Sequence, residues 1–211
     1  SGDALVNIEN ITGSNFNDNL TGNSANNIIN GGAGADRIDG VSGSDTSSYS
    51  DSDAAVIVNL ATNINSGGYA NGDTLFNIDN ITGSEFDDVL TGNSANNVII
   101  GGGGFDIIDG GDGNDTVSYI NSDAAVLVSL DLGDNRGGYA MGDTLFNVLF
   151  NIENIVGSDF DDTFLIGDSN SNIINGGDGA DGIYGAEGND FLFGGNGNDI
   201  INGGAGVDKI D

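Results

Sequence analysis

The sequence predicts an all-β solenoid, in which the chain winds into stacked coils of about eighteen residues and each coil contributes short parallel strands. Three observations predict this fold. The chain repeats itself at long intervals, a nonapeptide recurs within each long repeat, and each nonapeptide combines a turn-forming half with one apolar strand position. We therefore expect a single continuous solenoid over residues 1–211, with longer coils between the nonapeptide blocks.

The long repeat can be read directly from the sequence. GDALVNIENITGS at 2–14 returns as GDTLFNIDNITGS at 72–84, and again from Gly142 as GDTLFNVLFNIENIVGS. The nonapeptides form blocks at 13–48, 83–118 and 157–211, separated by interludes at 49–82 and 119–156. Because the sequence begins and ends within these repeats, we expect it to be a piece of a longer protein.

Each nonapeptide has two fixed columns. The sixth residue is Asp, or Asn in three units, and the eighth is apolar in every unit except the one that contains Ser47. The first six residues are rich in glycine, which permits positive φ angles, and in Asp and Asn, which favour tight turns. The last three place one apolar side chain between two variable ones, as in a short strand whose centre faces the core. Two nonapeptides then make one coil.

The interludes carry a different pattern. DAAVIVNL and DAAVLVSL alternate between apolar and other residues, with Val56, Val58 and Leu60 on one face, and this alternation predicts longer strands. GGYANGD and GGYAMGD resemble nonapeptide turns with one inserted residue. The interludes should therefore continue the solenoid.

Stacking brings the sixth-position carboxylates of neighbouring coils together. The register predicts the pairs Asp18–Asp36, Asp88–Asp106, Asp162–Asp181 and Asp181–Asp199, with Asp190–Asp208 on the opposite edge. Two carboxylates about 5 Å apart repel by roughly 3 kcal/mol at an effective dielectric constant of about 20. Repeated along both edges, this repulsion would open the coils unless cations lie between the turns.

The composition decides which cation fits. The chain has 33 acidic residues, three basic ones and a formal charge of −30, so nucleic acids are poor partners. Without cysteine or histidine it has no thiolate or imidazole ligand and no disulfide. Carboxylate and carbonyl oxygens in loose loops suit Ca²⁺, whereas Mg²⁺ prefers a tight octahedron. We expect several Ca²⁺ ions, and no apolar run is long enough to span a membrane.

The pattern GGxGxD, followed by an apolar residue between two variable ones, resembles the RTX, or haemolysin-type, calcium-binding nonapeptide. GGAGADRID, GGGGFDIID, GGDGNDTVS, GGDGADGIY, GGNGNDIIN and GGAGVDKID match it completely. The resemblance covers the nonapeptide blocks and implies a right-handed parallel β-roll, in which each calcium ion lies between stacked turns and is held by the sixth-position Asp and by turn carbonyls. The aspartates assigned in this way are Asp18, Asp36, Asp45, Asp88, Asp106, Asp115, Asp162, Asp181, Asp190, Asp199 and Asp208. The glycines are Gly32, Gly34, Gly102, Gly104, Gly111, Gly113, Gly177, Gly179, Gly188, Gly195, Gly197, Gly204 and Gly206.

Other positions are second-rank metal candidates or depart from the pattern. The second-rank candidates are Asp73 and Asp143 in the interludes, and Asn27, Asn97 and Asn172 at sixth positions. Phe replaces the fourth-position glycine in the first unit of each block, and we expect Phe16, Phe86 and Phe160 to fill the core while their units bind metal weakly. The loss of an inward apolar residue in GVSGSDTSS should weaken Asp45 as a ligand.

These features predict a calcium-dependent structural module of a secreted or cell-surface bacterial protein, as a spacer, surface-layer or adhesin segment, and the resemblance implies type I secretion. Catalysis is not expected, because it needs two carboxylates in different environments and no such pair stands out from the repeated carboxylates. One alternative is a non-catalytic glycan-binding module of a secreted polysaccharide-acting enzyme, with exposed Tyr69 and Tyr139 stacking on sugars. An ice-binding solenoid is less favoured, because the outward ninth position is irregular. Besides calcium, the expected partners are extracellular polysaccharide or neighbouring protein modules.

Overall fold

A computed structural model describes residues 8–130, 135–136 and 146–211. In this part of the chain the structure consists of short strands and a single 3₁₀ turn, η1. The elements are β1 (Asn10–Thr12), β2 (Asn19–Thr21), β3 (Ile28–Asn30), β4 (Arg37–Asp39), β5 (Thr46–Ser48), β6 (Ile57–Asn59), η1 (Gly68–Ala70), β7 (Thr74–Phe76), β8 (Asn80–Thr82), β9 (Val89–Thr91), β10 (Val98–Ile100), β11 (Ile107–Asp109), β12 (Thr116–Ser118), β13 (Leu127–Ser129), β14 (Asn135–Arg136), β15 (Phe146–Phe150), β16 (Asn154–Val156), β17 (Phe164–Ile166), β18 (Ile173–Asp178), β19 (Gly182–Tyr184), β20 (Phe191–Asn196), β21 (Ile200–Asn202) and β22 (Lys209–Ile210).

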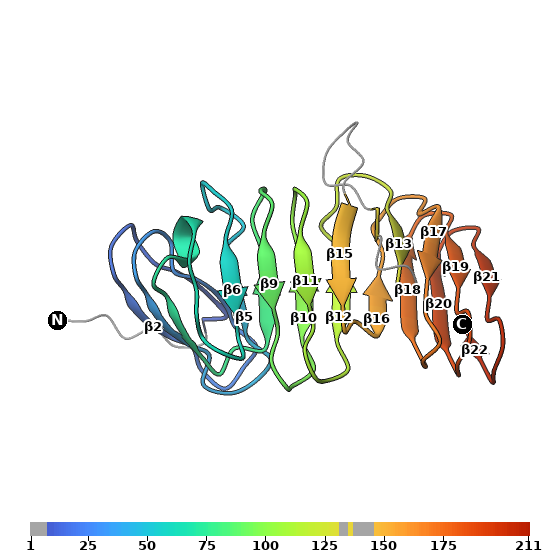
Figure 1. Ribbon diagram of the computed structural model, residues 1–211, viewed down its shortest axis with the longest axis horizontal. Coiled ribbons are helices and arrows are strands. Elements are labelled where there is room, and N and C mark those ends of the chain that lie inside the picture. The colour runs from blue at the N-terminus through green and yellow to red at the C-terminus, as the bar shows by residue number, and fades with distance from the viewer. Residues whose placement is uncertain (1–7, 131–134, 137–145) are drawn as a thin grey trace.

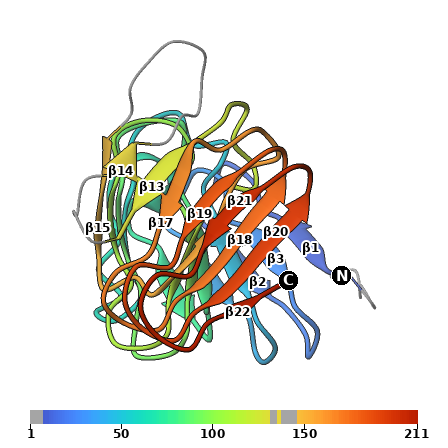
Figure 2. The same ribbon diagram turned by 90° about the vertical axis from the view of Figure 1, so that its right-hand side faces the viewer.

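The strands form three sheets. Ten strands stack in the order β1-β3-β5-β8-β10-β12-β16-β18-β20-β22, nine in the order β21-β19-β17-β13-β14-β15-β11-β9-β6, and β2, β4 and β7 form the third sheet. Among the named strands, pairing is parallel except where β14 meets β13 and β15. Figure 1 shows the strands side by side along the long axis, with β2 near one end and β22 near the other. Figure 2, turned by 90°, shows the chain winding around a narrow interior, which confirms the predicted parallel β-solenoid.

The register between coils follows the nonapeptide spacing. Ile11 of β1 pairs with Ile29 of β3, and Ile29 pairs with Ser47 of β5, so one coil contains two nonapeptides. The extra residue of the third block lies between Asp162 and β17, not at Ile166, because Asp162 meets Asp181 nineteen residues on whereas Leu165 pairs with Ile183 eighteen residues on. Ile155 of β16 accordingly pairs with Ile174 of β18. The solenoid accommodates this insertion without losing the alignment of its inward side chains.

The core is a column of inward side chains at the centres of the strands. The exposed fraction is 0% for Ile29, Ile38, Ile81, Leu90, Ile99, Ile108, Val117, Ile155, Leu165, Ile174, Ile183 and Leu192. Ser47 occupies the same column and is also fully buried. Because each coil contributes so little apolar surface, its stability depends on the coils stacked against it.

The interludes place two strands on the same side of the solenoid. In the first interlude β6 pairs with β9 of the next block, whereas β7 pairs with β4 of the preceding block. In the second, β13 pairs with β17 and β15 with β11. The prediction of longer strands is wrong for β6 and β13, which contain three residues each. β6 ends at Asn59, where the chain enters a turn that is closed by a hydrogen bond from the N–H of Asn63 to the carbonyl of Asn59 at 2.8 Å.

Candidate metal sites

The sixth residues of the repeats line two edges of the solenoid. The first edge precedes the strands of the nine- and three-stranded sheets and carries Asp18, Asp36, Asp73, Asp88, Asp106, Asp162, Asp181 and Asp199. The second edge precedes the strands of the ten-stranded sheet and carries Asn27, Asp45, Asn97, Asp115, Asn172, Asp190 and Asp208. Both edges are therefore rows of carboxylate and amide groups at coil spacing.

One hydrogen bond recurs between successive coils: the backbone N–H of a sixth residue donates to a side-chain oxygen of the sixth residue in the next coil. This bond joins all five pairs predicted from the register, at 2.8 Å for Asp18–Asp36, 3.0 Å for Asp88–Asp106, 2.9 Å for Asp162–Asp181, and 3.1 Å for Asp181–Asp199 and Asp190–Asp208. It uses one oxygen of the accepting carboxylate. The partner of the other oxygen then decides whether the turn needs a cation.

The repeats differ in whether the second oxygen of the sixth side chain has a hydrogen-bond partner. In some repeats the turn backbone donates to it, as Ser14 does to Oδ2 of Asp18. In others it is buried without a partner, which holds for Oδ2 of Asp36, Asp45, Asp115, Asp181 and Asp190, each with 0–1% exposure. A buried carboxylate without compensation is unfavourable by several kcal/mol. A cation beside these oxygens would remove that cost.

The backbone of the second residue in the turn causes this difference. In the units that we call open, the second residue has a positive φ angle, as at Gly32 (82°) and Gly177 (104°). The N–H of Gly32 then donates to Oδ1 of Asn30 at 2.8 Å and not to Asp36. In the closed units the same N–H donates to the sixth side chain, as from Ser14 to Asp18 at 2.6 Å. The open units are 31–39, 40–48, 101–109, 110–118, 176–184, 185–193, 194–202 and 203–211, and the closed units are the other six nonapeptides.

In open and closed turns alike, a backbone carbonyl of the next coil lies near the sixth-position side chain, and in the open turns it faces an oxygen without a hydrogen-bond partner. A Cβ atom on Gly176 would collide with Oδ2 of Asp181 and with the carbonyl oxygen of Gly194 in the next coil, so both oxygens border one small space. The same arrangement recurs at Gly185. Among the described residues no three acidic side chains gather at one point, so carbonyls would supply the remaining ligands. Carboxylates combined with several carbonyl oxygens fit Ca²⁺.

The turn glycines adopt the predicted conformation. Their φ angles lie between 82° and 149° at Gly32, Gly34, Gly102, Gly104, Gly111, Gly113, Gly177, Gly179, Gly188, Gly195, Gly197, Gly204 and Gly206. Their lack of a side chain also permits close approach between coils. A Cβ atom on Gly197 would overlap the carbonyl oxygen of Gly179, and one on Gly206 would overlap that of Gly188. Glycine therefore brings successive turns close enough to share ligands.

Burial of the carboxylates changes their ionisation. It is the main cause that raises the pKa values of Asp36, Asp45, Asp115 and Asp190. At Asp181 burial, followed by the charges of neighbouring aspartates, raises the pKa to about 6. Ionised carboxylates in these turns are therefore disfavoured until a positive charge compensates them.

The first unit of each block is closed by its own serine. The N–H and Oγ of Ser84 donate to Asp88 at 2.5 and 2.8 Å, and those of Ser158 donate to Asp162 at 2.8 and 2.6 Å. Both oxygens of each carboxylate are thus satisfied within the protein. These units need no cation to balance their hydrogen bonds.

The phenylalanines of these units do not fill the core. Phe16, Phe86 and Phe160 are 78%, 43% and 44% exposed, so the expectation that they are core residues is wrong. The backbone of each stacks directly against a glycine of the next coil, Gly34, Gly104 or Gly179, and in this stack the side chain projects outward.

The three Asn units are closed by their amides. The Oδ1 atom of Asn97 accepts the N–H of Asn93 at 2.8 Å, while its Nδ2 donates to the carbonyl of Asp79 at 2.6 Å. Asn172 donates likewise to the carbonyl of Glu153 at 2.7 Å, and Asn27 to that of Ile8 at 3.2 Å. The amide N–H thus donates to a carbonyl of the preceding coil. A carboxylate at the same position has no such donor and would need a cation between the two oxygens.

The remaining candidates have mixed surroundings. Asp73 takes a sixth position on the first edge, where its carboxylate accepts the N–H of Asp36 at 2.8 Å and the hydroxyl of Tyr49 at 3.2 Å. Asp45, expected to be a weak ligand, has the same buried and unpartnered Oδ2 as its open-unit counterparts. Asp143 and Tyr139 lie outside the described residues. Tyr69, expected to be exposed, is partly buried, because it packs against the core and its N–H donates to Ser52 Oγ at 3.0 Å.

Two acidic residues on the second edge are absent from the sequence-based candidates. Asp79 accepts the N–H of Asp45 at 2.9 Å, and Glu153 accepts the N–H of Asp115 at 2.7 Å. Both belong to the interlude motif N-I-D/E-N-I. Asp79 lies eighteen residues, or one coil, before the sixth residue Asn97. The repeat spacing could therefore have identified Asp79 as a candidate.

Comparison with known proteins supports the assignment of the repeats. The family model of the RTX calcium-binding nonapeptide repeat matches residues 12–46, 82–117, 156–192 and 175–210, which together cover more than half of the chain. No curated protein matches the chain. The matched stretches contain both the open and the closed units described above. The chain belongs to the RTX family of calcium-binding nonapeptide repeat proteins.

Proposed function

We propose that this chain is a calcium-dependent spacer of a secreted or cell-surface bacterial protein, exported unfolded by type I secretion and folded by calcium outside the cell. The observation that carries the proposal is the set of buried, unpartnered Oδ2 atoms in the open units, at Asp36, Asp45, Asp115, Asp181 and Asp190. These atoms make the stacked turns depend on a cation for their stability.

Calcium affinity links this dependence to the cell exterior. Extracellular calcium modules bind with dissociation constants of about 10⁻⁴–10⁻³ M, far above the free calcium level that cytosolic sensors detect. Because a cation that binds only the folded state adds its binding energy to folding, the chain would remain unfolded at low calcium and fold at high calcium. The RTX family is typical of secreted or extracellular bacterial proteins.

A structural role fits the regularity of the acidic groups. RTX repeats are non-catalytic calcium-binding units, and Asp36, Asp45, Asp115, Asp181 and Asp190 all have a buried Oδ2 without a hydrogen-bond partner. Within the described residues, no helix is long and apolar enough to cross a membrane. A solenoid whose coils add length along one axis is suited to holding two parts of a protein apart.

Circular dichroism with and without calcium tests the proposal. In excess EGTA we expect the β-sheet signal to be largely lost, and millimolar Ca²⁺ should restore it, while equal Mg²⁺ should be much less effective because the loops cannot form a tight octahedron. A spectrum that remains β-rich and unchanged in EGTA would contradict calcium-dependent folding.

A further inference from the structure

Two acidic residues outside the nonapeptide pattern continue the second edge across the interludes. The N–H of Asp45 donates to Oδ2 of Asp79 at 2.9 Å, and in return the carbonyl of Asp45 accepts the N–H of Asp79 at 2.9 Å. Asp115 and Glu153 make the same exchange, at 2.7 and 3.1 Å. Each interlude acid therefore takes the place of a sixth-position Asp in the coil that follows a block.

Oxygen atoms converge at both junctions. The Oδ2 atoms of Asp45 and Asp115 are buried without a hydrogen-bond partner, and both residues are 0% exposed. A Cβ atom on Gly40 would collide with the carbonyl oxygen of Asn77 and lie 2.5 Å from Oδ2 of Asp45. One on Gly110 would likewise meet the carbonyl oxygen of Asn151 and lie 2.7 Å from Oδ2 of Asp115.

The backbone of the interlude is bent to present these carbonyls. Asn77 and Asn151 have φ angles of 50° and 49°, a left-handed conformation that is uncommon outside glycine and that Asn tolerates better than most residues. A short turn from Asn77 to Asp79 thereby replaces the six-residue turn of a nonapeptide. The first-position carbonyl and the sixth-position carboxylate of the open units are both reproduced.

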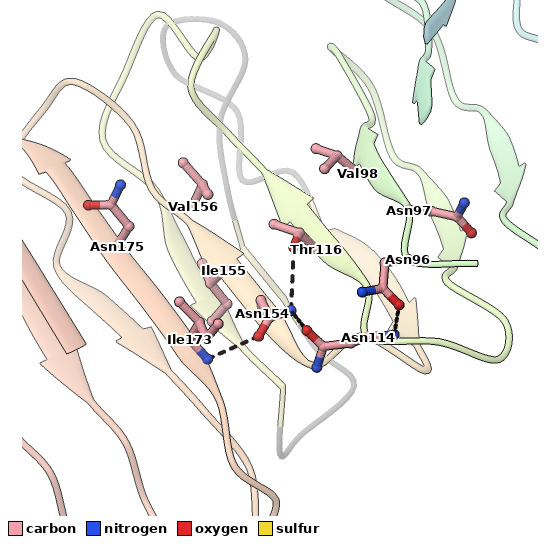
Figure 3. Close-up of a pocket in the computed structure, with 10 residues that line it drawn as sticks. All are labelled: Asn96, Asn97, Val98, Asn114, Thr116, Asn154, Ile155, Val156, Ile173 and Asn175. Atoms are coloured by element: carbon pink, nitrogen blue, oxygen red, sulfur yellow. Dashed lines mark hydrogen bonds between the residues drawn. The ribbon is translucent and has the colours of Figure 1, made fainter. Parts of the chain in front are cut away.

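The residue after each acid locks the turn in place. Nδ2 of Asn154 donates to Oδ1 of Asn114 at 2.9 Å, and its Oδ1 accepts the N–H of Ile173 at 3.0 Å, so it bonds to the coils on both sides (Figure 3). At the other junction Nδ2 of Asn80 donates to Oγ of Ser44, and its Oδ1 accepts the N–H of Val98, both at 2.9 Å. The acids at 79 and 153 are thus held in register.

In the part of the chain whose side chains the structure describes, no cationic side chain forms an ion pair with these acids. Within the described residues the one ion pair joins Arg37 to Asp39. At each junction a fully buried carboxylate and a carbonyl oxygen therefore border one space, and the second carboxylate is hydrogen-bonded to the backbone of the first acid. Such a set of hard oxygen atoms binds a divalent cation of the calcium type.

We propose that Asp79 and Glu153, which lie outside the nonapeptides, complete the calcium sites of Asp45 and Asp115, together with the carbonyls of Asn77 and Asn151. These sites clamp each interlude to the block before it. The inference rests on the proposed calcium-dependent function.

A charge-removing double variant tests the two sites. Asp79→Asn with Glu153→Gln keeps an oxygen that can accept the N–H of Asp45 or Asp115 but removes both charges. The control, Asp53→Asn with Glu85→Gln, makes the same chemical changes at exposed turn positions. Equilibrium dialysis against radioactive calcium should show two fewer ions bound per chain in the test variant than in the control and the unmodified chain.

The outcomes separate this inference from the proposed function. An unmodified chain that binds no calcium would overturn the proposed function. Calcium binding by the unmodified chain, with equal numbers of ions in the test variant and the control, would overturn the junction sites alone. If circular dichroism shows that the double variant does not fold in calcium, Asp79→Asn and Glu153→Gln are measured singly. Each should then lose one ion, and retention of every ion by either variant contradicts its site.

Discussion

The backbone N–H of Asp181 donates to Oδ1 of Asp199 at 3.1 Å, across two neighbouring coils of the first edge. The equivalent bond on the second edge joins Asp190 to Asp208, also at 3.1 Å. The two pairs share no residue although they alternate along the chain. Sites on opposite edges should therefore respond independently to substitution.

Asp199→Ala tests this independence. We expect calcium at the site shared with Asp181 to bind at least about tenfold more weakly, because the cage loses a carboxylate. The Asp190–Asp208 site should remain nearly unchanged, since solenoid stability is a sum of neighbour terms. Crystals of the variant grown with calcium would reveal the occupancy of each site, with Asn198→Ala as the control. Loss of the Asp190–Asp208 ion alone would refute the arrangement in two edges.

The calcium-free chain should gain structure as the pH falls. The pKa values of Asp181 and Asp73 are raised to about 6 in the folded state, from about 3.9 in an unfolded chain. A raised folded-state pKa contributes stability that is fully present below the unfolded value and is lost as the pH rises through about 6. In calcium-depleted buffer the β-sheet signal in circular dichroism should therefore be stronger at about pH 5 than at about pH 7.5. The opposite trend would show that these carboxylates are not buried in the calcium-free fold.

A glycine at position 41 should stabilise the chain. Val41 has a φ angle of 78° and is 46% exposed, so its β-branched side chain strains the turn and contributes little burial. Val41→Gly should raise the free energy of unfolding in saturating calcium by about 1 kcal/mol, after the entropic cost of glycine is subtracted. Urea denaturation measures this change. Val207→Gly, at a position that is 78% exposed and has no positive φ, should show no gain, and equal gains in both variants would contradict the explanation.

Asn97 should contribute to stability without binding calcium. Asn97→Ala leaves the N–H of Asn93 and the carbonyl of Asp79 without their partner, which should cost about 1–3 kcal/mol in saturating calcium. The number of bound ions should not change, because the amide already satisfies the turn. Denaturant unfolding and equilibrium dialysis measure the two quantities, with exposed Asn96→Ala as the control. Loss of an ion in Asn97→Ala would make Asn97 a ligand after all.

The fold and the spacing of the sites could be predicted because one periodicity determines both. The repeat spacing specifies that Ile29 lies between Ile11 and Ser47, and the same spacing brings Asp181 against Asp199. Glycine at fixed turn positions predicts positive φ angles, since few other residues adopt them.

The repeat spacing could not reveal which oxygens are already satisfied. Asp88 and Asp106 occupy equivalent columns, but the serine at position 84 closes the turn of Asp88 while the glycine at 102 opens that of Asp106. The direction of the Phe86 side chain depends on how closely the next coil stacks, which sequence alone does not give. Asp79 escaped prediction because its turn is shorter than a nonapeptide although it keeps the coil register.

The central claim is that calcium binds in the open turns and not in the closed ones. Anomalous scattering from crystals grown in calcium measures this directly, because it locates each ion relative to the carboxylates. We predict two rows of ions, one per edge, beside the open-unit aspartates and most densely in residues 176–211, where four open units follow one another. Ions found mainly in the closed turns of Asp18, Asp88 and Asp162, beside Phe16, Phe86 and Phe160, would contradict the account.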